Sequence, residues 1–142
     1  MGILGIGREQ RPHSYTLYCP PLDTSPCIAR DFVASALRRL RLDRVADAAT
    51  LCTSELATNA YLHAPGLGSL LWLDVRPELL RITVYDGSRQ EPVVRPDCAE
   101  REGGRGLRLV GELADAWGCC PGAPLGVGGA EGKGVWFTIA CR

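Results

Sequence analysis

Residues 69–88, SLLWLDVRPELLRITVYDGS, decide which fold this chain can adopt. Two runs rich in Leu, Val, Ile and aromatic residues, 69–76 and 79–86, are joined by Pro77-Glu78. A connection this tight between two alternating runs is typical of an antiparallel β-hairpin. We therefore predict two neighbouring antiparallel strands here, and not the parallel strands of a doubly wound sheet.

Two helices are predicted before this hairpin. Ser25 followed by Pro26 has the form of an N-cap with proline at the first helical position, which predicts a helix over 26–40. A second helix is predicted from near Asp43 to about Ala64. Their apolar stripes consist of Ile28, Phe32, Ala36, Leu37 and Leu40 in the first helix and Val45, Ala49, Cys52, Leu56 and Ala60 in the second.

The remaining elements are shorter. Residues 14–19, 116–120 and 135–141 are predicted as strands, and residues 105–113 as a helix. Strands joined mainly by hairpins, with helices grouped between them, predict an α+β fold. We expect a two-layer sandwich with helices on one face of a mainly antiparallel mixed sheet.

The length of the chain fits a single domain. Domains most often contain roughly 100 to 150 residues, and this chain has 142. We place the domain at 13–142, after a flexible tail of residues 1–12. Residues 87–104 are polar, rich in Pro, Glu and Arg, and without a clear period, which predicts a mobile lid.

Charge and hydropathy argue against several classes of protein. The 16 basic and 16 acidic side chains cancel, so no overall field attracts nucleic acid or an anionic membrane. No run of about 18 apolar residues occurs, and the first residues lack the pattern of a signal peptide. We expect a cytoplasmic protein, and the preference for Arg over Lys indicates a bacterial source with a GC-rich genome.

The cysteines predict no bonded framework. Their number, seven, is odd, and they lack C-x-x-C spacing, so neither disulfides nor a zinc site are indicated. Cys119 and Cys120 are adjacent, but alternation along a strand would place them on opposite faces. We expect most cysteines to be small apolar residues of the core.

A polar stripe on the second helix could carry chemistry. Glu55, Asn59 and His63 lie at i, i+4 and i+8, to one side of the apolar stripe. Carboxylate and carboxamide oxygens in this arrangement suit Mg²⁺, which binds few protein ligands together with substrate phosphates. The alternative is an ordinary solvated helix face.

Two later segments could hold the rest of a nucleotide. Asp86 ends an apolar strand and is followed by Gly87, so its carboxylate could accept a hydrogen bond from a base amine; the alternative is a simple Asp-Gly turn. In 103–107, glycines would let the backbone approach a phosphate at the start of the next helix, and Arg105 could add a charged contact. The alternative there is a flexible helix start with a solvated Arg.

One apparent motif is rejected. Gly132-Lys133-Gly134 suggests a phosphate-binding Walker A loop, but Val127 stands where the leading glycine is required. Gly134 also replaces the Ser or Thr that would meet the metal. We interpret this segment as a flexible turn into the last strand.

In combination and in order, these segments resemble the GHKL family, the histidine-kinase-like ATPases. The matching features are a helix with Glu55 and Asn59 followed by His63, a strand that ends in Asp86-Gly87-Ser88, and residues 104–110 leading to 113–118. Within the family the chain looks most like the small stand-alone bacterial anti-sigma regulatory factors of the serine/threonine kinase type. The resemblance implies the histidine-kinase-like ATPase fold.

The resemblance also implies roles, with ATP and Mg²⁺ as cofactors. Asn59 would hold the Mg²⁺ that bridges the phosphates, and Glu55 would act as general base or orient the attacking hydroxyl. Asp86 would bind the adenine amine. The remaining candidate nucleotide-binding residues are those that would contact the phosphates, Gly104, Arg105 and Gly106, and their neighbours in the matching motifs, His63, Gly87 and Leu107.

The function implied is that of a regulator which phosphorylates a serine of an antagonist, an anti-anti-sigma protein, and sequesters a sigma factor. Similar proteins often form homodimers. Ser88 stands where the wider family has a glycine, which is a departure from the family pattern. The motifs therefore support nucleotide binding better than they support turnover. The alternatives are a non-catalytic nucleotide-binding module, a purely protein-binding regulatory module, and an unrelated α+β domain.

Overall fold

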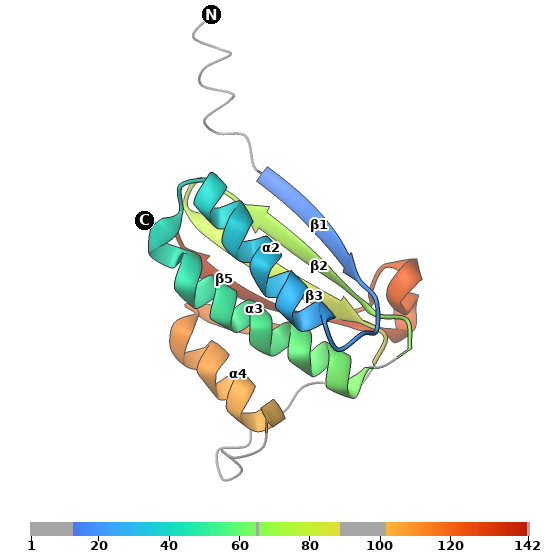
Figure 1. The fold of residues 1–142 in the computed structure, drawn as a ribbon. Coiled ribbons are helices and arrows are strands. Elements are labelled where there is room, and N and C mark those ends of the chain that lie inside the picture. Colours follow the sequence, from blue (N-terminus) through green and yellow to red (C-terminus); the bar gives the residue numbers. More distant parts are fainter. Residues whose placement is uncertain (1–12, 65, 89–101, 142) are drawn as a thin grey trace, which may run out of the picture.

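A computed structural model describes residues 13–64, 66–88 and 102–141, with the backbone alone for 102–105. The described residues form three α-helices and a five-stranded sheet, and Figure 1 shows the helices in front of the sheet. In chain order the helices and strands are β1 (His13–Cys19), α2 (Ser25–Arg39), α3 (Asp43–His63), β2 (Ser69–Val75), β3 (Leu79–Asp86), α4 (Glu102–Leu113), β4 (Ala116–Pro121) and β5 (Lys133–Ala140). Two short 3-10 helices, η2 (Leu125–Val127) and η3 (Gly129–Glu131), lie between β4 and β5.

The sheet has the strand order β1-β2-β3-β5-β4, and each neighbouring pair is antiparallel. This confirms the α+β class. The expected mixed character is wrong for the described strands, because β4 and β5 form a second antiparallel pair that joins β3 through β5.

The hairpin that decides the fold has the predicted geometry. Leu73 lies opposite Ile82 in the ladder between β2 and β3. At the turn, the Arg76 N–H donates to the Leu79 carbonyl at 2.9 Å, and the Leu79 N–H donates back at 3.4 Å. Pro77 and Glu78 are therefore the two central residues of the connection.

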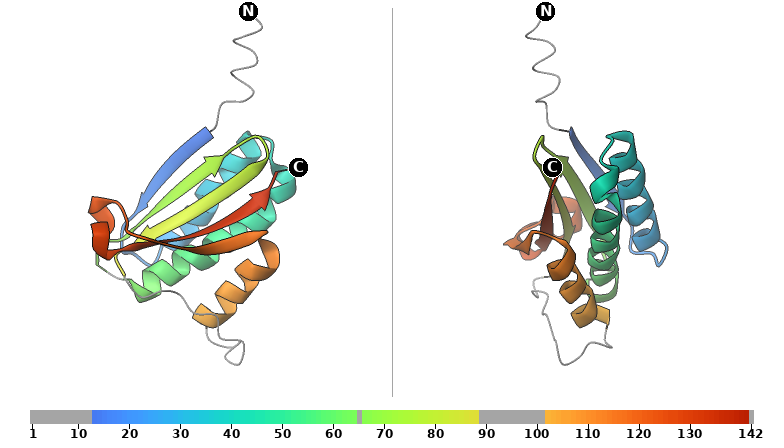
Figure 2. Two further views of the ribbon diagram at one scale, coloured as in Figure 1. Left: turned by 180° about the vertical axis from the view of Figure 1, so that it is seen from behind. Right: turned by 90° about the vertical axis from the view of Figure 1, so that its left-hand side faces the viewer.

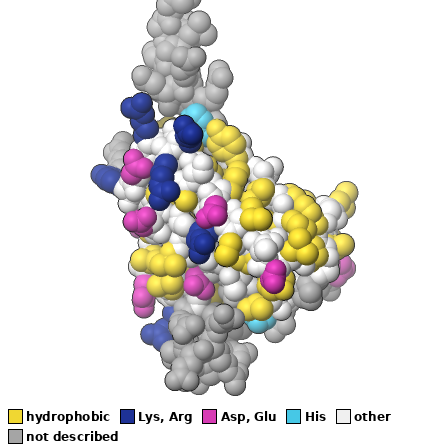
Figure 3. Space-filling view, viewed as in Figure 1, with side chains coloured by type: hydrophobic (Ala, Val, Ile, Leu, Met, Phe, Trp, Pro, Cys, Tyr) yellow, Lys and Arg dark blue, Asp and Glu magenta, His cyan; other side chains and the backbone are white. Residues whose placement is uncertain are grey.

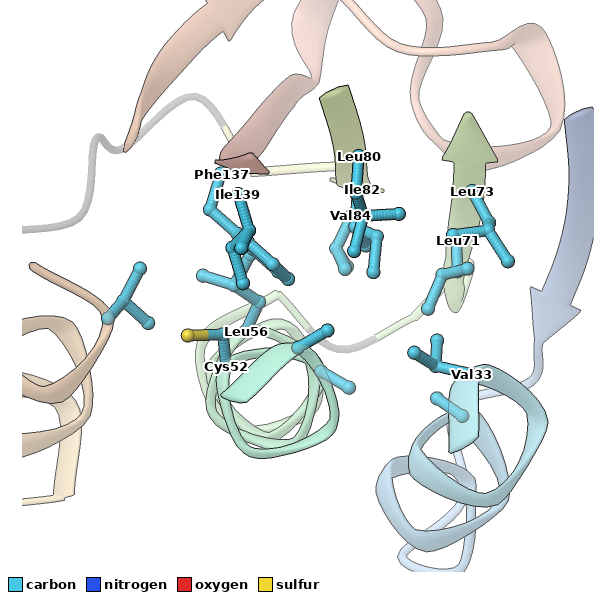
Figure 4. Close-up of a cluster of buried hydrophobic side chains, with 14 of the residues drawn as sticks. Val33, Cys52, Leu56, Leu71, Leu73, Leu80, Ile82, Val84, Phe137 and Ile139 are labelled. Carbon is cyan, nitrogen blue, oxygen red and sulfur yellow. The ribbon is translucent and has the colours of Figure 1, made fainter. Parts of the chain in front are cut away.

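The helices lie on one face of the sheet, as Figure 2 shows in its right-hand view. α2 and α3 pack against each other, and α4 packs beside α3 near β4. The core between the layers contains Val33 from α2, Leu56 from α3 and Leu73, Ile82 and Phe137 from the strands (Figure 4). Burial of these side chains against the sheet is the main stabilisation of the fold.

The start and the apolar face of α2 differ from the prediction. Ser25 is the first helical residue and not the N-cap, and its hydroxyl donates to the Pro20 carbonyl at 2.7 Å. The buried row is Ala29, Val33 and Leu37, whereas Ile28 is 54% exposed. A small residue, Ala29, allows the helix to approach the sheet closely, which the periodicity of large apolar residues did not reveal.

The region of the predicted lid is described only at its two ends. α4 begins at Glu102, three residues before the predicted start at 105, so residues 103 and 104 belong to the helix and not to the predicted lid. Residues 89–101, most of the predicted lid, and the predicted tail 1–12 lie outside the described residues.

Charged and apolar side chains separate on the helical side of the molecule. Figure 3 shows Arg side chains gathered where α2 ends and α3 begins, and apolar side chains gathered where α2 begins and α3 ends. Apolar residues exposed there include Leu22, Ile28 and Leu62. Within the described ranges, no helix has the length and apolar character needed to cross a membrane.

Candidate functional site

α3 places the polar stripe at the flank of the helix. Its apolar stripe faces the sheet, with Leu56 and Ala60 almost fully buried, as predicted. Glu55 and Asn59 are half-buried beside that stripe, one helical turn apart. His63 is exposed at the last position of the helix, so it does not share the environment of the other two.

The structure brings Glu55 against α4. A Cβ placed on Gly106 would lie 2.5 Å from Glu55 Oε2 and 3.3 Å from its Cδ. Only a residue without a side chain allows this approach, since real Cβ contacts are longer. Two candidate residues that are distant in the sequence therefore meet in the fold, with the Glu55 carboxylate beside the first half of α4.

The beginning of α4 lies in this same region. Gly104, Arg105 and Gly106 belong to the first five residues of the helix. The first four N–H groups of a helix lack intrahelical partners and carry a partial positive charge, which suits an anion. Leu107 is 2% exposed and belongs to the hydrophobic core, so it anchors the helix through packing.

Asp86 already has donors within the protein. The Lys133 ammonium donates to Asp86 Oδ1 at 2.8 Å and to Oδ2 at 3.0 Å, and the Ser88 N–H donates to Oδ1 at 2.8 Å. Asp86 is 3% exposed and Lys133 is 7% exposed. The sequence predicted a carboxylate next to bare backbone, whereas the structure shows a buried ion pair.

Lys133 was missed by the sequence analysis. It was interpreted as part of a flexible turn, which is wrong, because it is the first residue of β5 and lies directly opposite Asp86 on β3. One signal was present in the sequence, since Lys133 is the only lysine of the chain. Its significance depends on the register between β3 and β5, which the sequence does not reveal.

Backbone closes over the end of β3. A Cβ on Gly132 would clash with the Asp86 carbonyl oxygen, and one on Gly128 would lie 2.7 Å from the Gly87 Cα. Gly128 also has a φ of 117°, a conformation that glycine adopts most readily. Gly128 is thus the close-packing position, whereas Gly87 itself is exposed, and the segment with η2 and η3 lies against the end of the strand that carries Asp86.

Cys52, next to the site, is a buried thiol, whereas Cys119 and Cys120 on β4 are half-buried. Burial, with a further contribution from the negative charge of Glu55, raises the pKa of the Cys52 thiol to about 11. Cys119 packs against the core, and its neighbour Cys120 lies on the other face of β4 opposite Gly134, as alternation predicts. In the part of the chain that the structure describes, no three His, Cys, Asp or Glu side chains are grouped as a metal site.

The candidate residues form two groups. Glu55 and Gly106 lie where α3 meets α4, with Asn59 one helical turn further along α3, and Asp86, Gly87 and Ser88 lie at the end of β3 with Lys133. Two concave regions of the described chain lie elsewhere. One is a small cavity lined by Ser25, Ala57 and Tyr61, and the other is an open hollow on the uncovered face of the sheet, lined by Leu70, Trp72, Tyr85 and Pro124.

Comparisons with known proteins add no family. No family model matches the chain, and the search of curated proteins found no match. The resemblance to the GHKL family therefore stays a prediction from the motifs, and the site must be judged by its own geometry.

That geometry fits a magnesium nucleotide at one end. Glu55 lies against Gly106 in the first half of α4, and Asn59 follows Glu55 by one helical turn on α3. Carboxylate and carboxamide oxygens and the first N–H groups of a helix are suitable partners for Mg²⁺ and phosphate. At the other end, the carboxylate that would bind the base amine is bonded to Lys133. A base can reach Asp86 only if this arrangement changes.

Proposed function

We propose that the chain is an ATP- and Mg²⁺-binding regulatory protein of the GHKL type. In this function it phosphorylates a serine of an antagonist, an anti-anti-sigma protein, and sequesters a sigma factor. The observation that supports it best is the contact of Glu55 with Gly106, because it joins the two motifs expected to surround the phosphates. Cytoplasmic localisation and a possible homodimer belong to the same proposal.

Each residue at the phosphate end has a chemical task in this proposal. Asn59 contributes a neutral oxygen ligand to the metal, and Glu55 accepts the proton of the attacking serine hydroxyl. The first N–H groups of α4 hold the phosphate oxygens. Bound Mg²⁺ supplies charge neutralisation, which together with positioning is most of what phosphoryl transfer needs.

Calorimetry with Mg-ATP tests the binding half of the proposal. We expect Asn59→Ala to raise the Kd for Mg-ATP by about tenfold or more, because an interaction between a polar group and a charge contributes about 1.5 kcal/mol or more to binding. Thr58→Ala is the matched control, since Thr58 is half-buried on the same helix turn but lies outside the stripe. Equal affinities of Asn59→Ala and wild type would contradict the metal assignment.

The catalytic half is tested separately with labelled ATP, Mg²⁺ and candidate antagonist proteins encoded beside the gene. We expect transfer of the label to a serine of one of them. Glu55→Gln should abolish the transfer and retain binding of Mg-ATP. Intact binding without transfer to any candidate would remove the kinase activity and leave the regulator.

A non-catalytic module is the second candidate, and the ion pair at Asp86 favours it. A protein that turns over ATP needs an accessible base site, whereas here Lys133 and Ser88 together make three hydrogen bonds to the carboxylate. In that case the chain would regulate by association alone. Absence of Mg-ATP binding in wild type, with partner binding intact, would support this candidate.

A further inference from the structure

The buried pair of Asp86 and Lys133 uses almost all of its hydrogen-bonding capacity internally. An ammonium has three donors. Those of Lys133 reach Asp86 Oδ1 at 2.8 Å, Asp86 Oδ2 at 3.0 Å and the Ser88 carbonyl at 3.4 Å. The ammonium therefore contacts both oxygens of the Asp86 carboxylate, which is 3% exposed. Asp86 Oδ1 also accepts a hydrogen bond from the Ser88 N–H.

A lysine ammonium at position 133 has different chemistry from an arginine guanidinium. The other basic residues of the chain are all arginine. A guanidinium is a wide planar fork, whereas an ammonium is a compact point charge on a flexible stem that can leave one partner and reach another. A Cβ on Gly132 would clash with the Asp86 carbonyl oxygen, so the backbone just before Lys133 lies close to the end of β3. An exchange of partners at Asp86 therefore suits an ammonium better than a guanidinium.

We propose that Lys133 is a specificity-determining residue of the base site: its ammonium occupies the acceptor positions of Asp86 and is displaced by the exocyclic amine of an incoming purine. This inference rests on the proposed nucleotide function. The exchange replaces one donor on Asp86 by another, so the carboxylate keeps a partner in both states, and the released ammonium retains the Ser88 carbonyl as its acceptor. Ligands without an amine cannot make the exchange and leave the pair closed.

The reactivity of Lys133 in the wild-type protein reports this displacement directly. Lys133 carries the only side-chain amine of the chain, so its acetylation is read without ambiguity from one peptide by mass spectrometry, with the α-amine as internal reference. We expect slow modification of the free protein and a several-fold faster modification in saturating Mg-ATP. A purine nucleotide that lacks only the 6-amino group should give no acceleration.

The sign of the change separates this role from a structural one. If the ion pair only stabilises the fold, a bound ligand reduces opening of the native state and Lys133 reacts more slowly. Slower or unchanged modification, at a concentration where calorimetry shows Mg-ATP bound, would overturn the proposal. This measurement needs no mutation, so it remains decisive even if variants of the pair fold poorly.

Variants give an independent measurement. We expect Lys133→Met to bind Mg-ATP about tenfold more tightly than wild type, because the competing donor is gone. The matched control is Arg39→Met, which removes an exposed positive charge at the end of α2. Thermal unfolding identifies the folded fraction of each variant.

The outcomes distinguish the inference from the function on which it rests. Mg-ATP binding of equal strength in wild type and folded Lys133→Met, weakened by Asn59→Ala, would overturn the inference and leave the nucleotide function intact. Absence of binding in wild type and in folded Lys133→Met would overturn both. Tighter binding in Lys133→Met together with faster modification of wild type supports both.

Discussion

Arg41, at the end of α2, adopts a backbone conformation that usually belongs to glycine. Its φ is 61°, and it is the only non-glycine residue in the described chain with a positive φ. The Leu42 N–H donates to the Leu37 carbonyl at 2.8 Å and the Arg41 N–H donates to the Arg38 carbonyl at 3.1 Å. This pair of bonds is the Schellman motif, in which the left-handed residue is commonly glycine.

We expect Arg41→Gly to raise the free energy of unfolding by about 0.5 to 1 kcal/mol. A left-handed conformation costs an L-residue roughly 1 to 2 kcal/mol, and glycine avoids this cost. Part of the gain is offset because glycine gives the unfolded chain more conformational entropy. Urea unfolding measures the change. Arg41→Ala is the control, since it removes the same charge and keeps the strain. A gain of equal size in Arg41→Ala would show that charge and not backbone strain was relieved.

At the level of single residues, sequence patterns identified some of what matters and missed the rest. Leu56 and Ala60 were predicted to be buried because periodicity on a helix depends only on nearby positions. The partner of Asp86 could not be found in this way. It depends on which residue of β5 lies opposite the end of β3, and that register is set by the whole sheet.

Among the elements, α4 shows how packing overrides intrinsic preference. Glycine is unfavourable in a helix by about 1 kcal/mol relative to alanine, and the predicted helix began only at residue 105, after Gly103 and Gly104. The structure starts the helix at Glu102. Gly106 is tolerated because a side chain there would collide with Glu55, so close packing of α3 and α4 decides the residue.

Two glycines of α4 should therefore respond differently to alanine. A Cβ on Gly111 would lie 3.4 Å from the Trp117 indole nitrogen, an acceptable contact, whereas a Cβ on Gly106 would lie 2.5 Å from Glu55 Oε2. We expect Gly111→Ala to stabilise the protein by about 0.5 to 1 kcal/mol, because alanine is favoured over glycine in a helix. Gly106→Ala should give no gain in stability, because the same advantage is offset by the displacement of Glu55. Thermal unfolding of both variants measures this, and equal gains would mean that Glu55 moves aside without cost.

Among the described residues, helices cover one face of the sheet and none covers the other. The order of hairpins and helices was sufficient to predict helices on one face only, since each element was close in sequence to its neighbour. What the order could not predict is the surface opposite. There Thr83 is 1% exposed between Trp72 and Trp136, and the Trp136 ring lies over Gly118. Such contacts require the register of four strands.

The stability of the whole molecule should fall in alkaline solution. Burial raises the pKa of the Cys19, Cys52, Cys141 and Tyr85 side chains, so the native state keeps protons that the unfolded chain has lost. Their stabilising contribution is complete below the unfolded pKa and is lost as the pH rises through the folded pKa. For Cys52 this window runs from the ordinary value of 9.0 to about 11.

Within that window we expect Cys52 alone to contribute a loss of roughly 1.4 kcal/mol per pH unit. Urea unfolding at several pH values between 8 and 11 measures the slope. Cys52→Ala should be less stable at neutral pH, because it leaves a small cavity, but should show a flatter dependence on pH. The same slope in both proteins would place the alkaline loss in other groups.

The single lysine of the chain also allows opening of the sheet to be measured by proteolysis, without a label. A lysine-specific protease has one internal cleavage site, after Lys133, and that bond lies at the start of a central strand paired on both sides. Cleavage there requires the sheet to open, whereas fraying of surface loops leaves the bond protected. The rate of one cut, read as the release of one C-terminal fragment, therefore measures the opening of the sheet in untagged protein and in dilute cell extract alike.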